Sequence, residues 1–101
     1  MTEVTRLDVD AIRRACEQYG VERLRLFGSA LSGRFDPEYS DIDFLVDFLP
    51  GRDDPFDDYF GLREALTEIV GRDVDLVVVR AIRNPYFKAS ALSSAEDVYA
   101  A

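Results

Sequence analysis

The apolar residues of this chain recur with two periods, one typical of helices and one typical of strands. A first set lies at the spacing of one helix face and consists of Val9, Ile12, Cys16 and Tyr19. Gly20 is placed to end that helix. Residues 21–27 (VERLRLF) then alternate apolar with charged side chains, which predicts a strand that ends before Gly28 and Ser29. A short helical stretch is expected from Ala30 to about Gly33.

Two further strands and a long helix are predicted next. Residues 41–49 (DIDFLVDFL) and 73–79 (DVDLVVV) are apolar runs of strand length, and β-branched residues dominate the second. Between them, Pro55 suits the first turn of a helix that Gly71 ends. We expect this helix to carry a wide apolar stripe of Phe56, Tyr59, Phe60, Leu62, Leu66, Ile69 and Val70.

The last part of the chain predicts one more helix and one more strand. Asn84 and Pro85 fit the N-cap and first position of a helix that reaches about Ser93, and residues 96–100 (EDVYA) predict a short edge strand. Strands separated by helices predict an α/β (α+β) fold, a mixed sheet of three to four strands with helices packed on it. With 11.4 kDa the chain has room for one core, so residues 1–101 are expected to form one domain.

Charge narrows the range of partners. The 20 acidic residues outnumber the 12 basic ones, and the net charge of −8 argues against direct binding of nucleic acid or of an anionic membrane surface. The first residues are charged throughout, and no apolar run approaches the ~20 residues of a membrane span. We therefore expect a cytoplasmic protein.

The chain contains no histidine and one cysteine, Cys16, which lies on an apolar helix face and is expected in the core. These counts exclude Ser-His-Asp and Cys-His catalysis, histidine zinc sites and a disulfide framework. Catalysis would have to come from carboxylates, hydroxyls, backbone amides or a hard metal bound by oxygen. The composition thus points to Mg²⁺.

Paired aspartates are the candidate metal ligands. The pattern D-x-D occurs three times, so the pattern alone decides nothing, and Asp8 with Asp10 fits a helix N-terminus. Asp41 and Asp43 share one strand face, about 6.6 Å apart along the strand. Because an unpaired buried charge is costly, two carboxylates beside an apolar run indicate a compensating cation. The alternative is a strand end that faces solvent.

Asp75 is the candidate third ligand. It lies near the start of the strand at residues 73–79, and Val74 and Leu76 face the opposite way. If the two strands are neighbours, three carboxylates converge at one end of the sheet. Oxygen ligands without histidine or thiolate suit Mg²⁺ rather than zinc.

Gly28 and Ser29 stand where a phosphate could bind. Glycine lets the backbone approach a phosphate, the serine adds a hydroxyl, and a helix start offers unpaired N–H groups. Alone, the pair is equally an ordinary strand-to-helix turn. Its order before Asp41, Asp43 and Asp75 is the specific feature.

With this order of motifs, the run LFGSALSGRFDPEYSDIDFLVDF resembles the G-S-x(n)-D-x-D signature of the DNA polymerase β-like nucleotidyltransferase superfamily. More narrowly it resembles the minimal nucleotidyltransferase (MNT) proteins, and the resemblance extends through GRDVDLVVV to the tail NPYFKASALSSAEDVYA. The resemblance implies one nucleotidyltransferase domain. Its reaction would be attack by an acceptor hydroxyl on the α-phosphate of a nucleoside triphosphate, with release of pyrophosphate.

The resemblance also implies roles for the aspartates. Asp41 and Asp43 match the pair that binds two Mg²⁺ ions in the family. Asp75 matches the residue that completes the metal site and helps to activate the acceptor. Two metals would stabilise the attacking and leaving oxygens.

Phosphate binding is implied for Gly28 and Ser29, which match the residues that hold the nucleotide's phosphates. Family members commonly carry a basic residue at the position of Ser32. Either Arg34, two positions on, or a partner's side chain supplies that charge here, or triphosphate binding is weaker.

The resemblance implies a protein partner as well. MNT proteins are typically antitoxins paired with a HEPN-family ribonuclease toxin, and some adenylylate a tyrosine of the toxin. We therefore expect an ATP- and Mg²⁺-dependent adenylyltransferase in a hetero-oligomer with a HEPN toxin that presents the acceptor. The alternative is a non-catalytic antitoxin that neutralises the toxin by binding. Nucleotidylation of a small molecule is a third hypothesis.

An acidic segment is open to two interpretations. Its residues are Asp53, Asp54, Asp57 and Asp58. They could dock a basic surface, as the non-catalytic hypothesis requires, or they could mark a helix N-terminus and a solvated loop.

Overall fold

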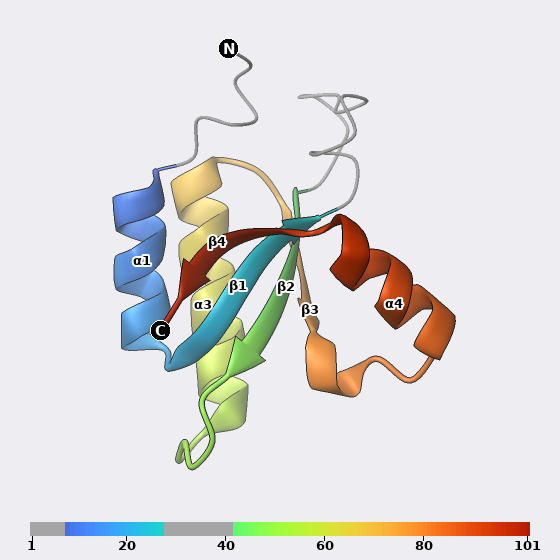
Figure 1. Cartoon of the computed structure of the whole chain (residues 1–101). Coiled ribbons are helices and arrows are strands. Elements are labelled where there is room, and N and C mark those ends of the chain that lie inside the picture. The colour runs from blue at the N-terminus through green and yellow to red at the C-terminus, as the bar shows by residue number, and fades with distance from the viewer. Residues whose placement is uncertain (1–7, 28–41) are drawn as a thin grey trace.

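A computed structural model describes residues 8–27 and 42–101. The elements in chain order are α1 (Val9–Gln18), β1 (Val21–Phe27), β2 (Ile42–Phe48), α3 (Pro55–Val70), β3 (Val74–Val78), the 3₁₀ helix η2 (Val79–Ala81), α4 (Pro85–Ser94) and β4 (Glu96–Ala100). Figure 1 shows them gathered around one twisted sheet.

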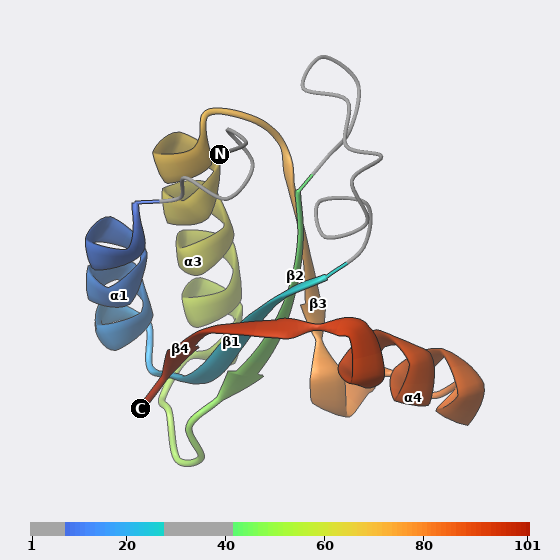
Figure 2. The same ribbon diagram turned by 45° about the horizontal axis from the view of Figure 1, so that its top comes forward.

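The sheet has four strands in the order β3-β2-β1-β4. β1 is antiparallel to both β2 and β4, and β2 is parallel to β3. α1 and α3 lie side by side on one face, whereas α4 lies on the other side of the sheet, between β3 and β4 in the chain (Figures 1 and 2). The predicted α+β class with a mixed sheet is confirmed, and the edge strand predicted at residues 96–100 is present.

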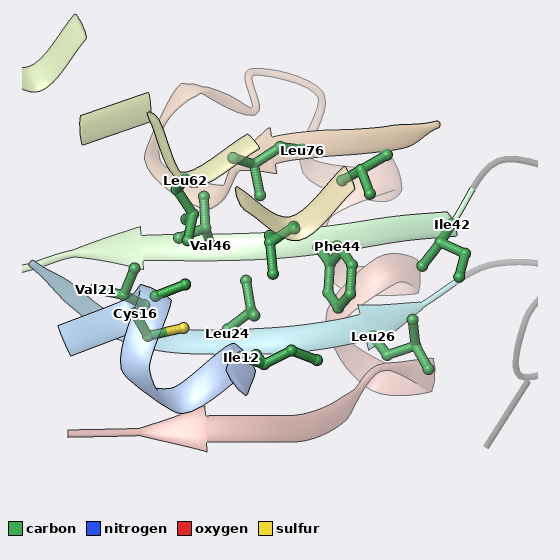
Figure 3. Packing of buried hydrophobic residues seen from close by; sticks show 13 residues of the cluster. Ile12, Cys16, Val21, Leu24, Leu26, Ile42, Phe44, Val46, Leu62 and Leu76 are labelled. Atoms are coloured by element: carbon green, nitrogen blue, oxygen red, sulfur yellow. The ribbon is translucent and has the colours of Figure 1, made fainter. Parts of the chain in front are cut away.

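The larger core cluster lies between the sheet and the pair α1 and α3. Figure 3 shows alternate residues of β1 and β2 pointing into it together with side chains of both helices, among them Ile12, Leu24, Phe44, Val46 and Leu62, all fully buried. A smaller cluster on the other face contains Leu45, Val79 and Ala91 and attaches η2 and α4 to the sheet. Alternation along the strands thus supplies apolar side chains to both faces.

Cys16 is fully buried in the larger cluster, as predicted. Burial raises the pKa of its thiol to about 12, with a smaller contribution from the charge of Glu17. A thiol held protonated in this way is a small apolar core residue rather than a nucleophile.

The helix ends follow their capping residues. Asp8 and Asn84 accept hydrogen bonds from backbone N–H groups at the starts of α1 and α4. Gly71 ends α3 in the left-handed region at a φ of 74°. Within residues 8–27 and 42–101, no helix is both long and apolar enough to cross a membrane.

The predicted apolar stripe of α3 is wrong at two positions. Leu62 and Leu66 are fully buried, but Phe56 and Phe60 are 77% and 54% exposed. At 100° per residue the two phenylalanines lie on the side of the helix turned away from the leucines. The helix predicted from Ala30 to Gly33 lies outside the described residues.

Candidate functional site

Asp43 and Asp75 are register partners on the neighbouring parallel strands β2 and β3. Adjacent strands lie about 4.8 Å apart, and paired residues of a parallel ladder project from the same face. The two strands are therefore neighbours, as the sequence analysis required, and they bring these two predicted carboxylates together. Asp43 is half-buried and Asp75 is exposed.

Burial of the flanking residues fixes the face from which these carboxylates project. Ile42 pairs with Val74 and Phe44 pairs with Leu76, and all four side chains are buried in the larger core cluster. The Ile42 N–H also donates to the Asp73 carbonyl oxygen at 3.1 Å, at the start of the pairing. A slip of one residue would turn the carboxylates into the core, so the apolar pattern holds them outside it.

The end of β1 meets the start of β2 at the same edge of the sheet. Phe27, the last residue of β1, pairs with Asp43. Gly28 and Ser29 follow Phe27 directly in sequence, and Asp41 precedes β2. The predicted site residues Gly28, Ser29, Arg34 and Asp41 lie outside the described residues.

α4 packs beside the carboxylates on their face of the sheet. The rings of Phe27 and Phe87 meet edge to face with centroids 6.4 Å apart. Ala91 of α4 packs with Leu45, which is two residues beyond Asp43 and on the same face of β2. The helix thus covers the sheet next to the pair, and Asp75 stays in contact with solvent.

The donor set of this pair suits a hard cation. Among the residues that the structure describes, no group of three or more His, Cys, Asp or Glu side chains converges. Asp43 and Asp75 supply carboxylate oxygens from adjacent strands, and two like charges so close are stabilised by a cation between them. Oxygen donors favour Mg²⁺ over softer metals.

The sequence matches the nucleotidyltransferase domain family over residues 9–98. The match includes all described strands apart from the last two residues of β4. This chain belongs to the nucleotidyltransferase domain family. Two proteins of Methanocaldococcus jannaschii named "Putative protein adenylyltransferase MJ1379" and "Putative protein adenylyltransferase MJ0128" are each 40% identical to it over 74 residues. The matches span 73% of this chain, and 73% and 72% of the two proteins.

Solved structures share the fold of this nucleotidyltransferase. One described as a "putative minimal nucleotidyltransferase" is 34% identical with a TM-score of 0.73, over 87% of this chain and 86% of that one. A toxin-antitoxin structure with AMP-PNP has a TM-score of 0.71 at 22% identity, over 94% and 75% of the two chains. A complex of a tri-AMPylated Shewanella oneidensis HEPN toxin with an MNT antitoxin has a TM-score of 0.62 at 21% identity, over 92% and 70%. The last two likenesses concern the fold alone.

Two residues of the acidic segment at 53–58, Asp54 and Asp58, make hydrogen bonds within this nucleotidyltransferase. Asp54 caps α3 by accepting from the Asp57 N–H at 3.0 Å. Asp58 is only 5% exposed, and each of its carboxylate oxygens accepts from Arg52, Nε and Nη2 both at 2.9 Å. Asp58 is therefore not available to dock a partner, and the docking interpretation of the segment is wrong at this residue.

The Arg52–Asp58 pair was missed by sequence reasoning. The sequence analysis assigned Asp58 either to a docking surface or to a helix N-terminus and solvated loop, and it made no prediction for Arg52. No periodic signal links a loop arginine to a helix residue six positions on. The one available clue is that Asp58 stands four residues before Leu62, on the buried line of α3.

Proposed function

We propose that this nucleotidyltransferase transfers AMP from ATP to a hydroxyl of a HEPN-type toxin, most simply a tyrosine, in a Mg²⁺-dependent reaction. The observation that carries the proposal is the in-register pair of Asp43 and Asp75 outside the core. The family supports the class of reaction, and the names of the Methanocaldococcus relatives support a protein as the acceptor.

In the proposed site, Asp41, Asp43 and Asp75 would hold two Mg²⁺ ions. The metal would supply charge neutralisation for the triphosphate and for the attacking and leaving oxygens. The acceptor oxygen forms a bond to the α-phosphorus as the bond between that phosphorus and the bridging oxygen breaks, and pyrophosphate leaves. Asp75, the more exposed of the described pair, accepts the hydroxyl proton.

Gly28, Ser29 and Arg34 are proposed to bind the phosphates of ATP. Their support is their order in the sequence and the pairing of Phe27 with Asp43, which ends β1 beside the carboxylates. A structural relative was solved with AMP-PNP, an ATP analogue, in agreement with ATP as the substrate.

The proposed partner rests on the structural relatives. One of them is an MNT antitoxin in complex with an AMPylated HEPN toxin. A complex of the same kind would present the acceptor hydroxyl to this chain.

The test is transfer of label from α-³²P-ATP to the purified product of the neighbouring gene, with and without Mg²⁺. Asp43→Asn is expected to lower the rate at least 100-fold, which corresponds to about 2.7 kcal/mol of transition-state stabilisation. Asp47→Asn is the matched control, because Asp47 is half-buried on the same face of β2, four residues away. Its rate should stay within twofold of the wild type.

Two results would contradict the proposal. Full-rate transfer by Asp43→Asn would remove the carboxylate pair from catalysis. No transfer by the wild type, with the toxin inhibited equally well by Asp43→Asn, would establish the non-catalytic antitoxin instead.

A further inference from the structure

The backbone of β3 presents two carbonyl groups to α3, one on each side of Asp75. β3 lies at the edge of the described sheet and pairs there with β2 (Figures 1 and 2). The Asp73 carbonyl oxygen accepts from the Ile42 N–H of β2, and backbone groups alternate in direction along a paired strand. Asp75 therefore directs its backbone groups toward β2, whereas Val74 and Leu76 direct their carbonyl groups outward.

Side chains of α3 donate to both outward carbonyl groups. The Tyr59 hydroxyl donates to the Leu76 carbonyl oxygen at 2.7 Å, and Arg63 Nε donates to the Val74 carbonyl oxygen at 3.4 Å. Four residues of a helix rise about 6.0 Å, and two residues of a strand span about 6.6 Å. The two donors are thus spaced to match the two acceptors, with α3 and β3 running in opposite directions.

The Tyr59 ring is held by packing, which fixes the position of its hydroxyl. It is half-buried against the larger core cluster, and the ring of Phe60 meets it edge to face with centroids 5.1 Å apart. Side chains locked by packing hold a functional group in place more precisely than exposed side chains do. Tyr59 therefore makes the stronger of the two contacts, and the exposed Arg63 makes the weaker one.

The separation of the Asp43 and Asp75 carboxylates depends on how firmly β3 is held beside β2. Asp75 is the second residue of β3, close to the turn that follows α3, and the ends of elements open most easily. Pairing with β2 sets the register of Asp75, and the contacts from α3 hold the strand from its other edge. Mg²⁺ demands near-ideal geometry, with ligand oxygens at about 2.0–2.1 Å, so a displaced carboxylate would bind it poorly.

We propose that Tyr59, assisted by Arg63, is a positioning residue that holds Asp75 at the distance from Asp43 that a bound cation requires. The inference rests on the proposed function, because it assigns the metal to this carboxylate pair. Tyr59 acts through the backbone of β3, since Leu76 enters the core on the α3 side and Asp75 projects from the opposite face of the sheet. A helix on the core side of the sheet thereby controls the geometry of a site on the other side.

The experiment measures metal binding directly, with Mn²⁺ as a paramagnetic probe for Mg²⁺. The EPR signal of the free ion gives the Kd for Mn²⁺ on the purified chain without nucleotide, so that only ligands of the protein contribute. Tyr59→Phe removes the hydroxyl and keeps the ring, and Arg63→Met removes the donor. Thr67→Val is the matched control, because the Thr67 hydroxyl donates at 2.8 Å to a carbonyl group of α3 itself, that of Arg63.

We expect Tyr59→Phe to raise the Kd for Mn²⁺ about tenfold, because groups that orient metal ligands change metal affinity by about 10–100-fold when they are removed. Arg63→Met should raise the Kd by a smaller factor, since its contact is longer and exposed. Thr67→Val should stay within twofold of the wild type. In an Asp75→Asn background, Tyr59→Phe should also change the Kd less than twofold, because the carboxylate that it positions is gone.

Thermal melting of the same proteins identifies a merely structural hydroxyl, which would lower the Tm without changing the Kd. An unchanged Kd in Tyr59→Phe, or no Mn²⁺ binding by the wild type, would overturn the positioning role and leave the transfer reaction to its own test. Equal weakening by Tyr59→Phe with and without the Asp75 carboxylate would also overturn it, because the hydroxyl would then act on the whole fold. Weaker Mn²⁺ binding that requires Asp75, together with no transfer by the wild type, would support the positioning role and refute the proposed function.

Discussion

At the scale of single residues, Asp75 offers the sharpest test of chemistry. It is exposed, it pairs with Asp43, and its neighbours Val74 and Leu76 already fill the core on the other face. Asp75→Asn keeps the size of the side chain but removes its charge and its ability to accept a proton at neutral pH. We expect kcat for AMP transfer to fall at least 100-fold, with a smaller change in the KM for ATP.

Single-turnover kinetics with labelled ATP check this expectation. Asp47→Asn again serves as the control on the same sheet face, since Asp47 lies on β2 away from the pair. Unchanged kcat in Asp75→Asn would exclude Asp75 as the proton acceptor and as a metal ligand.

A second residue-scale prediction concerns acid stability. Hydrogen bonds from Arg52 hold the pKa of Asp58 below its ordinary value, against the opposing effect of burial. A carboxyl whose folded pKa is lowered stabilises the fold above its unfolded pKa of about 3.9 and loses that effect as pH falls through the folded value. Asp58→Asn should therefore lower the free energy of unfolding by about 2 kcal/mol at pH 7 and have less effect below pH 4.

Urea denaturation at a series of pH values measures this difference. Asp97→Asn is the matched comparison, because hydrogen bonds from Arg23 also lower the pKa of Asp97, but its side chain is 53% exposed. Solvent screens such a pair, so we expect little change in that variant. Equal destabilisation in the two variants would show that burial of Asp58 does not matter.

At the scale of elements, the contact between α1 and α3 depends on Gly61. A Cβ built at Gly61 would overlap the ring of Tyr19, at the end of α1. Alanine is the better helix former by about 1 kcal/mol, but overpacking at a close contact costs about 1–3 kcal/mol. Gly61→Ala should therefore destabilise the protein.

The effect of Gly61→Ala on the free energy of unfolding should change sign when the Tyr19 ring is removed. In a Tyr19→Ala background, Gly61→Ala should stabilise by up to about 1 kcal/mol, because only the helix preference remains. Urea denaturation of the four proteins in this cycle gives both values. Stabilisation by Gly61→Ala in the wild-type background would refute the packing argument.

The elements themselves were largely predictable from local patterns. Alternation in residues 21–27, the apolar run of residues 41–49, and the caps Asn84 and Gly71 predict elements whose observed bounds agree within about two residues. The exposure of Phe56 and Phe60 was not predictable in this way. An apolar pattern shows which residues could be buried. Which side of a helix is buried depends on the elements that pack against it in the tertiary structure.

The site also has one part that local sequence patterns predict and one part that they do not. The face of each carboxylate follows from alternation, since Ile42 and Phe44 must enter the core if Asp43 does not. That Asp43 lies opposite Asp75 depends on the pairing of β2 with β3, which no local pattern specifies. The Arg52–Asp58 pair is of the same kind, a contact set by the path of a loop.

At the scale of the whole molecule, the acidity has more than one origin. Part of the acidic excess is neutralised internally, as at Asp58 and Asp97, and part caps helices, as at Asp8 and Asp54. The carboxylates of Asp43 and Asp75 lie in register at the start of β2 and β3. They concentrate negative charge at the end of the sheet where β1 ends, as a site for a cation requires.

This distribution predicts a stability that depends on metal and nucleotide. A ligand that binds only the folded state stabilises it by about 2.7 kcal/mol at 100 times its Kd, and 1 kcal/mol shifts the Tm of a domain of this size by about 4–8 °C. At 100 times the Kd, Mg²⁺ with AMP-PNP should thus raise the Tm by about 11–22 °C. EDTA should abolish the shift, since the triphosphate would then face Asp43 and Asp75 without neutralisation. Asp43→Asn should lose most of the shift and Asp47→Asn should keep it, whereas an equal shift in EDTA would mean that the nucleotide binds without the aspartates' metal.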